Sequence, residues 1–218
     1  INLDAERGVY LDHNAVLSVV EGGQLPIWAP VAGNAWAALR KEGAGKLTLG
    51  EENTFKGNLY MDEGEVELLG ADPLDAFWID MGPTNTSALV QLSLGNGVLL
   101  TNSLTVRSNK TGAASTHTIA MYAAGAGSAE TRAETMYLDN SVIVGVDTED
   151  TLTISTCMNG WGDGNKVRIM KDWPGTLILN NTNNFKYMEV VEGTVRSPDG
   201  VDNALWKWTD LLIQGDGT

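Results

Sequence analysis

The amino-acid sequence predicts an all-β solenoid, a chain that winds in stacked coils of short strands. Candidate strands, marked by alternating apolar residues, recur roughly every 8–10 residues with little sign of helix. Glycine is abundant and proline scarce, at 25 and 6 of 218 residues, which suits many tight turns and few rigid linkers. Both β-sandwiches and solenoids have strands at this spacing. A longer segment of the sequence also recurs, and this favours the solenoid because solenoid repeats stack over a shared core.

The recurring segment first occurs at Leu39–Leu69. Apolar and polar residues alternate there in short runs, which predicts half-buried strands of about five residues each. Glycines separate the runs, where they adopt a positive φ at little steric cost. The apolar pairs are Leu47 and Leu49, Leu59 and Met61, and Val66 and Leu68, the turn is Glu51–Asn53, and the glycines are Gly43, Gly45, Gly57 and Gly64.

The second copy lies at Ile169–Ser197, offset from the first by 130 residues. A one-residue deletion precedes the last two matches. The matched pairs are Lys41 and Lys171, Gly45 and Gly175, Leu47 and Leu177, Leu49 and Leu179, Asn53 and Asn183, Phe55 and Phe185, Gly64 and Gly193, and Val66 and Val195.

The pattern K-x-G-x-G-x-L-x-L, followed by N-T-[YF] and a short glycine-bounded strand, resembles the autotransporter-associated β-strand repeat of large bacterial surface proteins. The segments Leu3–Val9 and Trp28–Gly33 also resemble those that precede that repeat. The second copy departs from the pattern, with Trp173 and Pro174 in place of Gly-Ala and Asn184 in place of Thr. The resemblance implies a right-handed parallel β-helix that is exported and displayed, and it implies no catalytic residues.

We expect residues 1–218 to form a single β-helix domain with repeat copies at about 39–69 and 169–197. At roughly 20–25 residues per coil the chain would make about ten coils, each rising ~4.8 Å. Solenoids need polar caps, yet Ile1–Leu3 begins as if in mid-strand and Leu211–Thr218 stops after a strand and a turn. The domain is therefore expected to be part of a longer chain or to stack end to end with other copies.

The remaining elements follow from local patterns. Short alternating runs predict strands in Ile1–Val20, Thr86–Ser108, Val142–Val146, Leu152–Ile154, Leu205–Trp208 and Leu211–Ile213. Pro26 and Pro30 predict an irregular corner over Leu25–Leu39, because proline cannot donate to a sheet ladder. Asp72–Asn85 and the glycine-rich Met158–Asn165 are expected to be loops.

One segment, Ile119–Leu138, has a composition that also suits a helix. Gly125 and Gly127 interrupt it, and each costs about 1 kcal/mol in a helix. We therefore predict strands at Ile119–Tyr122 and Thr135–Leu138 with a turn between them, and a short helix is the alternative.

The net charge of −14 argues against nucleic acid and against anionic membrane surfaces as partners. No apolar run approaches the roughly 20 residues that span a bilayer, so no membrane insertion is expected. No basic and apolar leader opens the sequence, so a signal peptide would have been removed or would lie upstream. The single cysteine, Cys157, cannot form an internal disulfide.

Calcium is the only cofactor that the sequence suggests, and the suggestion is weak. Asn159–Asn165 faintly resembles a calcium-binding nonapeptide repeat, with Asp163 as its acidic residue. Asp147, Glu149 and Asp150 form a second acidic cluster, although an acidic turn is more often only solvated. Asn53 and Asn183 occupy matched turn positions, where asparagine commonly bonds to the backbone rather than to a ligand.

An enzyme of the polysaccharide lyase or hydrolase kind is an alternative, because parallel β-helices include such enzymes. Arg168 and Lys171 lie close to Asp163 and Asp172 in the sequence, as a carboxylate site with a basic partner requires. Lys171 matches Lys41, however, which indicates a structural role. His13 and His117 have no neighbours that suggest a triad or a metal site. No catalytic or cofactor-binding residue is assigned.

Seven tryptophans suggest either corner packing or a sugar-stacking surface. They are Trp28, Trp36, Trp78, Trp161, Trp173, Trp206 and Trp208. Trp206 and Trp208 share one face of an expected strand and form the best candidate for a binding patch, with surface glycans as possible partners.

The resemblance to the autotransporter-associated repeat implies a structural or adhesive scaffold, non-catalytic and located outside a bacterial cell or on its surface. The alternatives are a filament or surface-layer subunit that stacks end to end with itself, and the glycan-processing enzyme described above.

Overall fold

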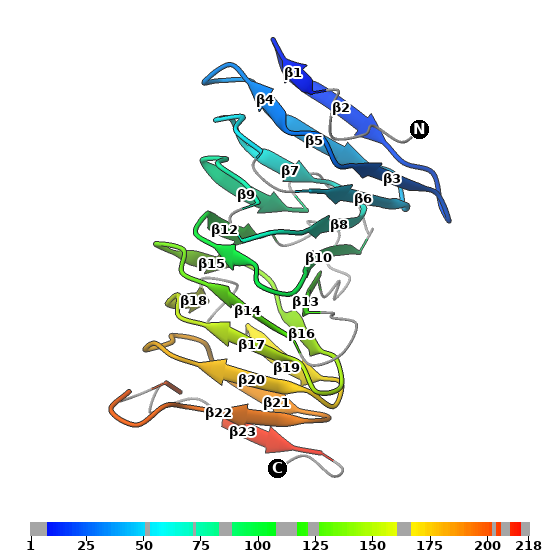
Figure 1. Ribbon diagram of the computed structural model, residues 1–218. Coiled ribbons are helices and arrows are strands. Elements are labelled where there is room, and N and C mark those ends of the chain that lie inside the picture. Colours follow the sequence, from blue (N-terminus) through cyan, green and yellow to red (C-terminus); the bar gives the residue numbers. More distant parts are fainter. Residues whose placement is uncertain are drawn as a thin grey trace.

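A computed structural model describes residues 8–50, 53–71, 73–82, 89–107, 117–121, 127–160, 167–201, 204–205 and 210–214. Within these ranges the regular structure is entirely β-strand, and the strands pair in parallel. Figure 1 shows the chain progressing steadily from one end of the molecule to the other, with each coil stacked on the one before it. The predicted all-β parallel solenoid is confirmed.

The coils number about seven, and the expectation of roughly ten was too high. Register partners near the N-terminus, such as Leu39 and Leu59, are separated by 20 residues. Leu104 and Met136 are register partners in adjacent coils although 32 residues separate them. Insertions between strands therefore lengthen the middle coils and reduce their number.

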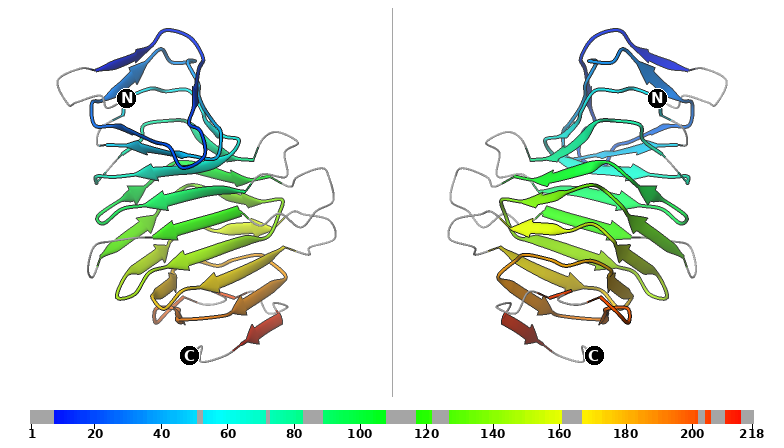
Figure 2. Two further views of the ribbon diagram at one scale, coloured as in Figure 1. Left: turned by 90° about the vertical axis from the view of Figure 1, so that its right-hand side faces the viewer. Right: turned by 90° about the vertical axis from the view of Figure 1, so that its left-hand side faces the viewer.

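Most coils contribute a strand to each of three sides of the solenoid, seen along its flanks in Figure 2. The nine-stranded sheet contains β3 (Gln24–Ile27), β6 (Lys46–Leu49), β8 (Gly64–Leu68), β10 (Val90–Leu94), β13 (His117–Met121), β16 (Val142–Val146), β19 (Arg168–Asp172), β21 (Tyr187–Val190) and β23 (Asp210–Ile213). The seven-stranded sheet contains β2 (Ala15–Ser18), β5 (Leu39–Glu42), β7 (Leu59–Met61), β9 (Trp78–Met81), β12 (Ser103–Val106), β15 (Met136–Leu138) and β18 (Met158–Gly160). The remaining strands are β1 (Val9–Leu11) with β4 (Val31–Gly33), and the five-stranded sheet of β11 (Leu99–Leu100), β14 (Ser128–Thr131), β17 (Thr151–Ile154), β20 (Thr176–Leu179) and β22 (Thr194–Arg196).

The core consists of apolar side chains that lie directly above one another in successive coils. In the nine-stranded sheet one such column contains Leu47, Val66, Leu92, Ile119 and Val144, each at most 1% exposed. Alternation directs every second side chain of a strand inward, so parallel register repeats the same position from coil to coil. Complete burial of one such side chain stabilises the fold by about 1.5–3 kcal/mol.

Two lysines interrupt these apolar columns, and both are fully buried. Lys41 follows Leu17 and precedes Met61 in the seven-stranded sheet. Its Nζ donates to the carbonyl oxygens of Glu42 and Gly43 in its own turn, and to that of Glu63 in the next coil, at 2.9 Å. Each lysine thereby satisfies carbonyls at a corner, where the sheet ladder ends.

Lys171 forms the same three bonds in the second copy. Its Nζ donates to Asp172 and Trp173 in its own turn and to Glu192 in the next coil, at 2.9, 2.6 and 3.1 Å. Trp173 stands where the first copy has Gly43, and it keeps the positive φ, 67° against 76°. The sequence match between the two lysines therefore reflects one corner structure, as the structural role predicted for Lys171 requires.

The two copies build this corner at different sides of the solenoid. Lys41 lies at the end of a strand of the seven-stranded sheet, and the corner leads into β6 of the nine-stranded sheet. Lys171 lies in β19 of the nine-stranded sheet, and its corner leads into β20 of the five-stranded sheet. The motif thus specifies a type of corner rather than a fixed position around the coil.

Asn53 joins three coils through its side-chain amide. Its Oδ1 accepts from the Val31 N–H of the preceding coil at 3.0 Å. Its Nδ2 donates to the carbonyls of Gly50 and Pro73, in its own coil and the next, at 2.8 and 2.7 Å. All three of these hydrogen bonds go to backbone groups, so the backbone role expected of this asparagine is the one observed.

Asn183 repeats the arrangement near the other end. Its Oδ1 accepts from the Met158 N–H at 3.0 Å, and its Nδ2 donates to Asn181 and Ala204, both at 2.8 Å. Like Asn53 it is buried, at 0 and 1% exposure. Both asparagines therefore take the place of a missing backbone ladder between coils.

Two segments expected to be irregular contain strands. Leu25–Leu39 includes most of β3 and all of β4, because Pro26 lies in the terminal strand of the nine-stranded sheet, where its missing N–H costs little. Asp72–Asn85, expected to be a loop, contains β9, which pairs on both sides with β7 and β12. Trp78, Ile79 and Met81 belong to this strand. The strand is only four residues long and lies between loop residues, so its alternating pattern is hard to recognise in the sequence.

The Ile119–Leu138 segment contains strands and, in its described part, no helix. The expected strands coincide with much of β13 and with β15, and β14 lies between them as an additional strand. Met158–Gly160, assigned to a loop from the sequence, forms β18. The expected Leu211–Ile213 strand is present within β23, whereas Trp206 and Trp208 lie outside the described residues.

Burial lowers the pKa of Lys171 to about 8, although the charges of Asp172 and Glu192 oppose this shift. An unfolded lysine keeps its ordinary pKa of 10.5, so between these values the unfolded chain binds the proton more tightly. The contribution of Lys171 to the free energy of unfolding therefore increases as the pH rises from about 8 to 10.5.

We predict that Lys171→Met lowers the free energy of unfolding at pH 7 by about 1–3 kcal/mol, because three carbonyls at a part-buried corner lose a donor. The deficit should widen between about pH 8 and 10.5, because only the wild type gains stability there. Denaturant titrations at several pH values measure both effects. Lys56→Met, at an exposed ion pair with Asp75, is the control and should change stability by less than about 0.5 kcal/mol. A deficit that shrinks with pH would contradict the assignment.

Candidate functional site

The acidic cluster suggested for calcium lies in a turn, where two of its carboxylates bond to backbone N–H groups. The Asp147 side chain accepts from the Thr148 N–H at 2.7 Å, and Asp150 accepts from the Gly127 N–H of the preceding coil at 2.9 Å. Glu149 is exposed and has a φ of 66°. Across the described ranges no three His, Cys, Asp or Glu side chains gather as metal ligands would. Asp163 lies outside those ranges.

The residues considered for an enzyme site are held apart by structural contacts. Arg168 pairs with Glu189 at 3.0 Å on the outer face of the nine-stranded sheet. Lys171 points into the core, and the Asp172 side chain accepts from the Trp173 N–H at 2.9 Å. Arg168 and Lys171 therefore lie on opposite faces of β19 and share no surface.

The two histidines lie in different environments, one exposed and one buried. His13 is exposed and lies 3.1 Å from Asp12. His117 occupies a core position between Val90 and Val142, where its Nδ1 accepts from the Val90 N–H at 3.2 Å. Burial lowers the pKa of His117, and the nearby Arg107 backbone opposes that shift. The ring is thus a neutral core side chain.

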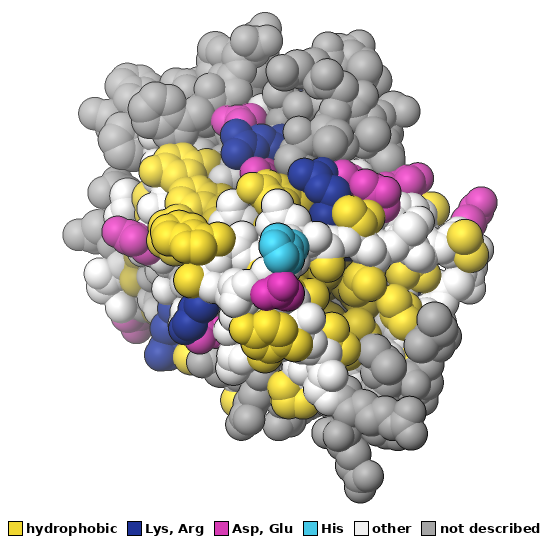
Figure 3. All heavy atoms as spheres, turned by 90° about the horizontal axis from the view of Figure 1, so that it is seen from above, with side chains coloured by type: hydrophobic (Ala, Val, Ile, Leu, Met, Phe, Trp, Pro, Cys, Tyr) yellow, Lys and Arg dark blue, Asp and Glu magenta, His cyan; other side chains and the backbone are white. Residues whose placement is uncertain are grey.

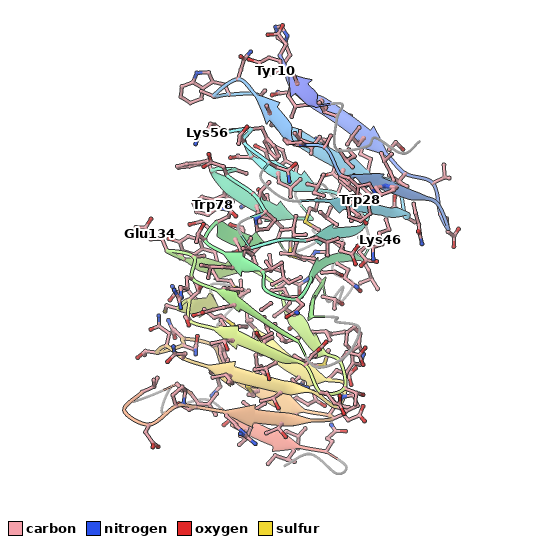
Figure 4. All side chains as sticks on the ribbon, viewed as in Figure 1. Tyr10, Trp28, Lys46, Lys56, Trp78 and Glu134 are labelled. Carbon is pink, nitrogen blue, oxygen red and sulfur yellow. The ribbon has the colours of Figure 1, made fainter. Side chains whose placement is uncertain are left out.

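The described tryptophans have different environments. Trp173 packs against Gly145, where an added Cβ would lie 2.6 Å from the indole. Trp28 is 45% exposed and lies on the opposite flank from Trp78 in Figure 4. Trp36 and Phe77 are more exposed, at 89% and 75%. Trp36, Phe77 and Trp78 line one surface depression.

This depression, the aromatic groove, has a volume of about 1110 Å³. It follows the corner at which each coil enters the seven-stranded sheet. Figure 4 shows Lys56, Trp78 and Glu134 one after another along this corner. The lining residues are Asn14, Ala35, Trp36, Ala38, Lys56, Gly57, Asn58, Tyr60, Leu74, Asp75, Ala76, Phe77, Trp78, Thr101, Asn102, Ser103 and Glu134.

Two rings of the aromatic groove, Trp78 and Tyr60, are held by neighbouring side chains. Trp78 stacks on Tyr137 with an interplanar angle of 4° and a centroid separation of 6.0 Å. Its Nε1 donates to Thr105 Oγ1 at 2.7 Å. The Tyr60 hydroxyl accepts from Asn58 Nδ2 at 3.0 Å, and Arg40 lies 4.8 Å from the Tyr60 ring centroid. These contacts restrain the orientations of the Trp78 and Tyr60 rings.

Asn102 lies at the aromatic groove with its side-chain amide buried. The residue is 6% exposed, and its Nδ2 donates to the Ala76 carbonyl of the preceding coil. Its Oδ1 is buried without a hydrogen-bond partner. Buried acceptors are nearly always paired, so this oxygen is the kind of exception that calls for a partner.

Charged residues elsewhere form small paired groups on separate faces. On the nine-stranded sheet, Lys46 lies 2.7 Å from Glu67 and 3.4 Å from Glu65, and these hydrogen bonds and charges raise the pKa of Lys46 despite its partial burial. On the seven-stranded sheet, Arg107 contacts both carboxylate oxygens of Asp80 at 2.9 Å. Neither group leaves a carboxylate pair facing an open cavity with a basic partner.

Comparison of the chain with protein-family models, curated proteins and solved structures gives no match. The fold is therefore assigned from the strand pairing in the structure. The resemblance to the autotransporter-associated repeat rests on the sequence motif alone. In the part of the chain that can be described, no helix has the length and apolar character needed to cross a bilayer.

Sequence reasoning missed the aromatic groove because its residues are scattered. It emphasised Trp206 and Trp208, which lie outside the described residues. Trp36, Phe77 and Trp78 come from two different coils, and Asn102 comes from a third. The available signal was the clustering of aromatic residues with asparagines just before strands of one sheet.

Proposed function

We propose that the chain is a rigid, non-catalytic β-helix scaffold of a bacterial surface protein, with a structural or adhesive role outside the cell. The observation that supports this most is the use of the motif residues: Lys41, Lys171, Asn53 and Asn183 all bond to backbone groups across coils. Side chains that bond successive coils to one another stiffen the solenoid, and a rod that projects from a cell surface requires such stiffness. Its resemblance to the autotransporter-associated repeat supports a right-handed winding and export.

The dispersed charges also support a scaffold over a glycan-processing enzyme. Such an enzyme needs carboxylates and a base that meet at one substrate site. The described acidic residues instead pair in small groups on different sheets, as Lys46 with Glu67 and Arg107 with Asp80 do.

The test is the location of the chain in its source bacterium. Antibodies against the purified chain should label intact cells, and external protease should remove the signal while leaving a cytoplasmic marker protein untouched. Labelling that appears only after the cells are permeabilised would contradict display at the surface.

End-to-end pairing of coils is a second candidate, favoured by apolar exposure at both ends. Leu211, Leu212 and Ile213 of β23 are each about half exposed, and the column that contains Leu211 and Ile213 faces inward in earlier coils. At the opposite end, viewed in Figure 3, hydrophobic side chains lie among polar and charged ones, and Val20 in the turn after β2 is more than half exposed. A following coil, from the same protein or from another copy, would cover these side chains.

If copies stack in this way, the sedimentation coefficient of the purified chain should rise with concentration, and Ile213→Glu should abolish the rise. Ser128→Glu, on the exposed face of β14, which is paired on both sides, is the control for charge alone. Monomers at every concentration would leave adjoining repeats of the same protein as the partner and would contradict stacking between copies.

A further inference from the structure

The lining of the aromatic groove repeats along the solenoid axis. Asn14, Ala38, Asn58, Trp78 and Ser103 lie in or just before five consecutive strands of the seven-stranded sheet, and Glu134 lies before the sixth. Five steps of about 4.8 Å give a length of about 24 Å. A ligand that makes equivalent contacts over this distance is an extended polymer rather than a compact small molecule.

The exposed rings indicate the chemistry of that polymer. Trp36 and Phe77 are 89% and 75% exposed, and Trp78 presents a ring already fixed by Tyr137. Flat rings offer large apolar area at low entropic cost. Sugar rings have an apolar C–H face that packs on such surfaces and a rim of hydroxyls that needs hydrogen-bond partners.

Polar groups between the rings match that rim. Asn58, Tyr60, Thr101 and Ser103 line the same groove. Hydroxyls both donate and accept, so one sugar unit can meet several of these groups at once.

Other polymers fit less well. A peptide that adds a strand needs a free sheet edge, but β7, β9 and β12 are paired on both sides. Lys56 is paired with Asp75, and Glu134 adds a further negative charge to the lining. With a net charge of −14 on the whole chain, acidic polysaccharides and nucleic acids are repelled.

We propose that the aromatic groove binds an uncharged polysaccharide chain, laid along the solenoid axis with its sugar rings against Trp36, Phe77 and Trp78. This goes beyond the scaffold role and holds whether or not the chain is displayed on a cell.

The test is native affinity electrophoresis of the purified chain in gels that contain uncharged polysaccharides of glucose, mannose, galactose, xylose or N-acetylglucosamine, or acidic polygalacturonate. At least one uncharged polymer should retard the protein, and polygalacturonate should not. Trp36→Ala and Phe77→Ala should each weaken the retardation by about fivefold or more. Both side chains are largely exposed, so the denaturation curves of these variants should match that of the wild type.

Trp28→Ala is the matched control, because Trp28 is a partly exposed tryptophan on the opposite flank. Its retardation should equal that of the wild type. The proposal is overturned if no uncharged polymer in the panel retards the protein, if only the acidic polymer does so, or if Trp28→Ala weakens binding as much as the groove variants. None of these outcomes bears on surface display, so failure here is distinguishable from failure of the scaffold role.

Discussion

The solenoid depends on how it satisfies backbone polar groups at its corners. Within the sheets, parallel ladders pair the N–H and C=O groups of each coil with its neighbours. Where the chain leaves one sheet for the next, the ladder stops, and unpaired buried groups would each cost about 1–3 kcal/mol. Lys41, Lys171, Asn53 and Asn183 fill these gaps, and each bonds to backbone groups in at least two coils. The corner side chains thus hold successive coils in the register that stacks the apolar side chains of the core.

Glycine makes the same corners possible by its lack of a side chain. A Cβ on Gly64 would lie 2.6 Å from the carbonyl oxygens of Gly43 and Gly45, and Gly64 has a φ of 76°. Gly193 occupies the equivalent place beside Trp173 and Gly175, with a φ of 80°. Lysine and glycine therefore act together at these corners. The ammonium bonds to the turn carbonyls, and the glycine of the next coil lets the two turns approach closely.

Local motifs made the fold class and the structural residues predictable, and features assembled across coils were not predictable. The roles of Lys171, Asn53 and Asn183 followed from their recurrence at matched positions. The coil count did not, because insertions such as the one between Leu104 and Met136 lengthen coils without changing strand patterns. β9 was missed because its four residues lie between turn-forming segments. The aromatic groove was missed because Trp36, Phe77 and Asn102 belong to three coils, and sequence order alone does not reveal which corners stack.

The central claim is that motif side chains replace the missing ladder between coils, and amide hydrogen exchange tests it most directly. Asn53 Oδ1 accepts from the Val31 N–H, and Asn183 Oδ1 accepts from the Met158 N–H. In Asn53→Ala the Val31 amide should lose protection while Met158 keeps it, Asn183→Ala should show the reverse, and Asn180→Ala, at an exposed neighbour, should change neither. Unchanged protection of Val31 and Met158 in the two corner variants would contradict the account.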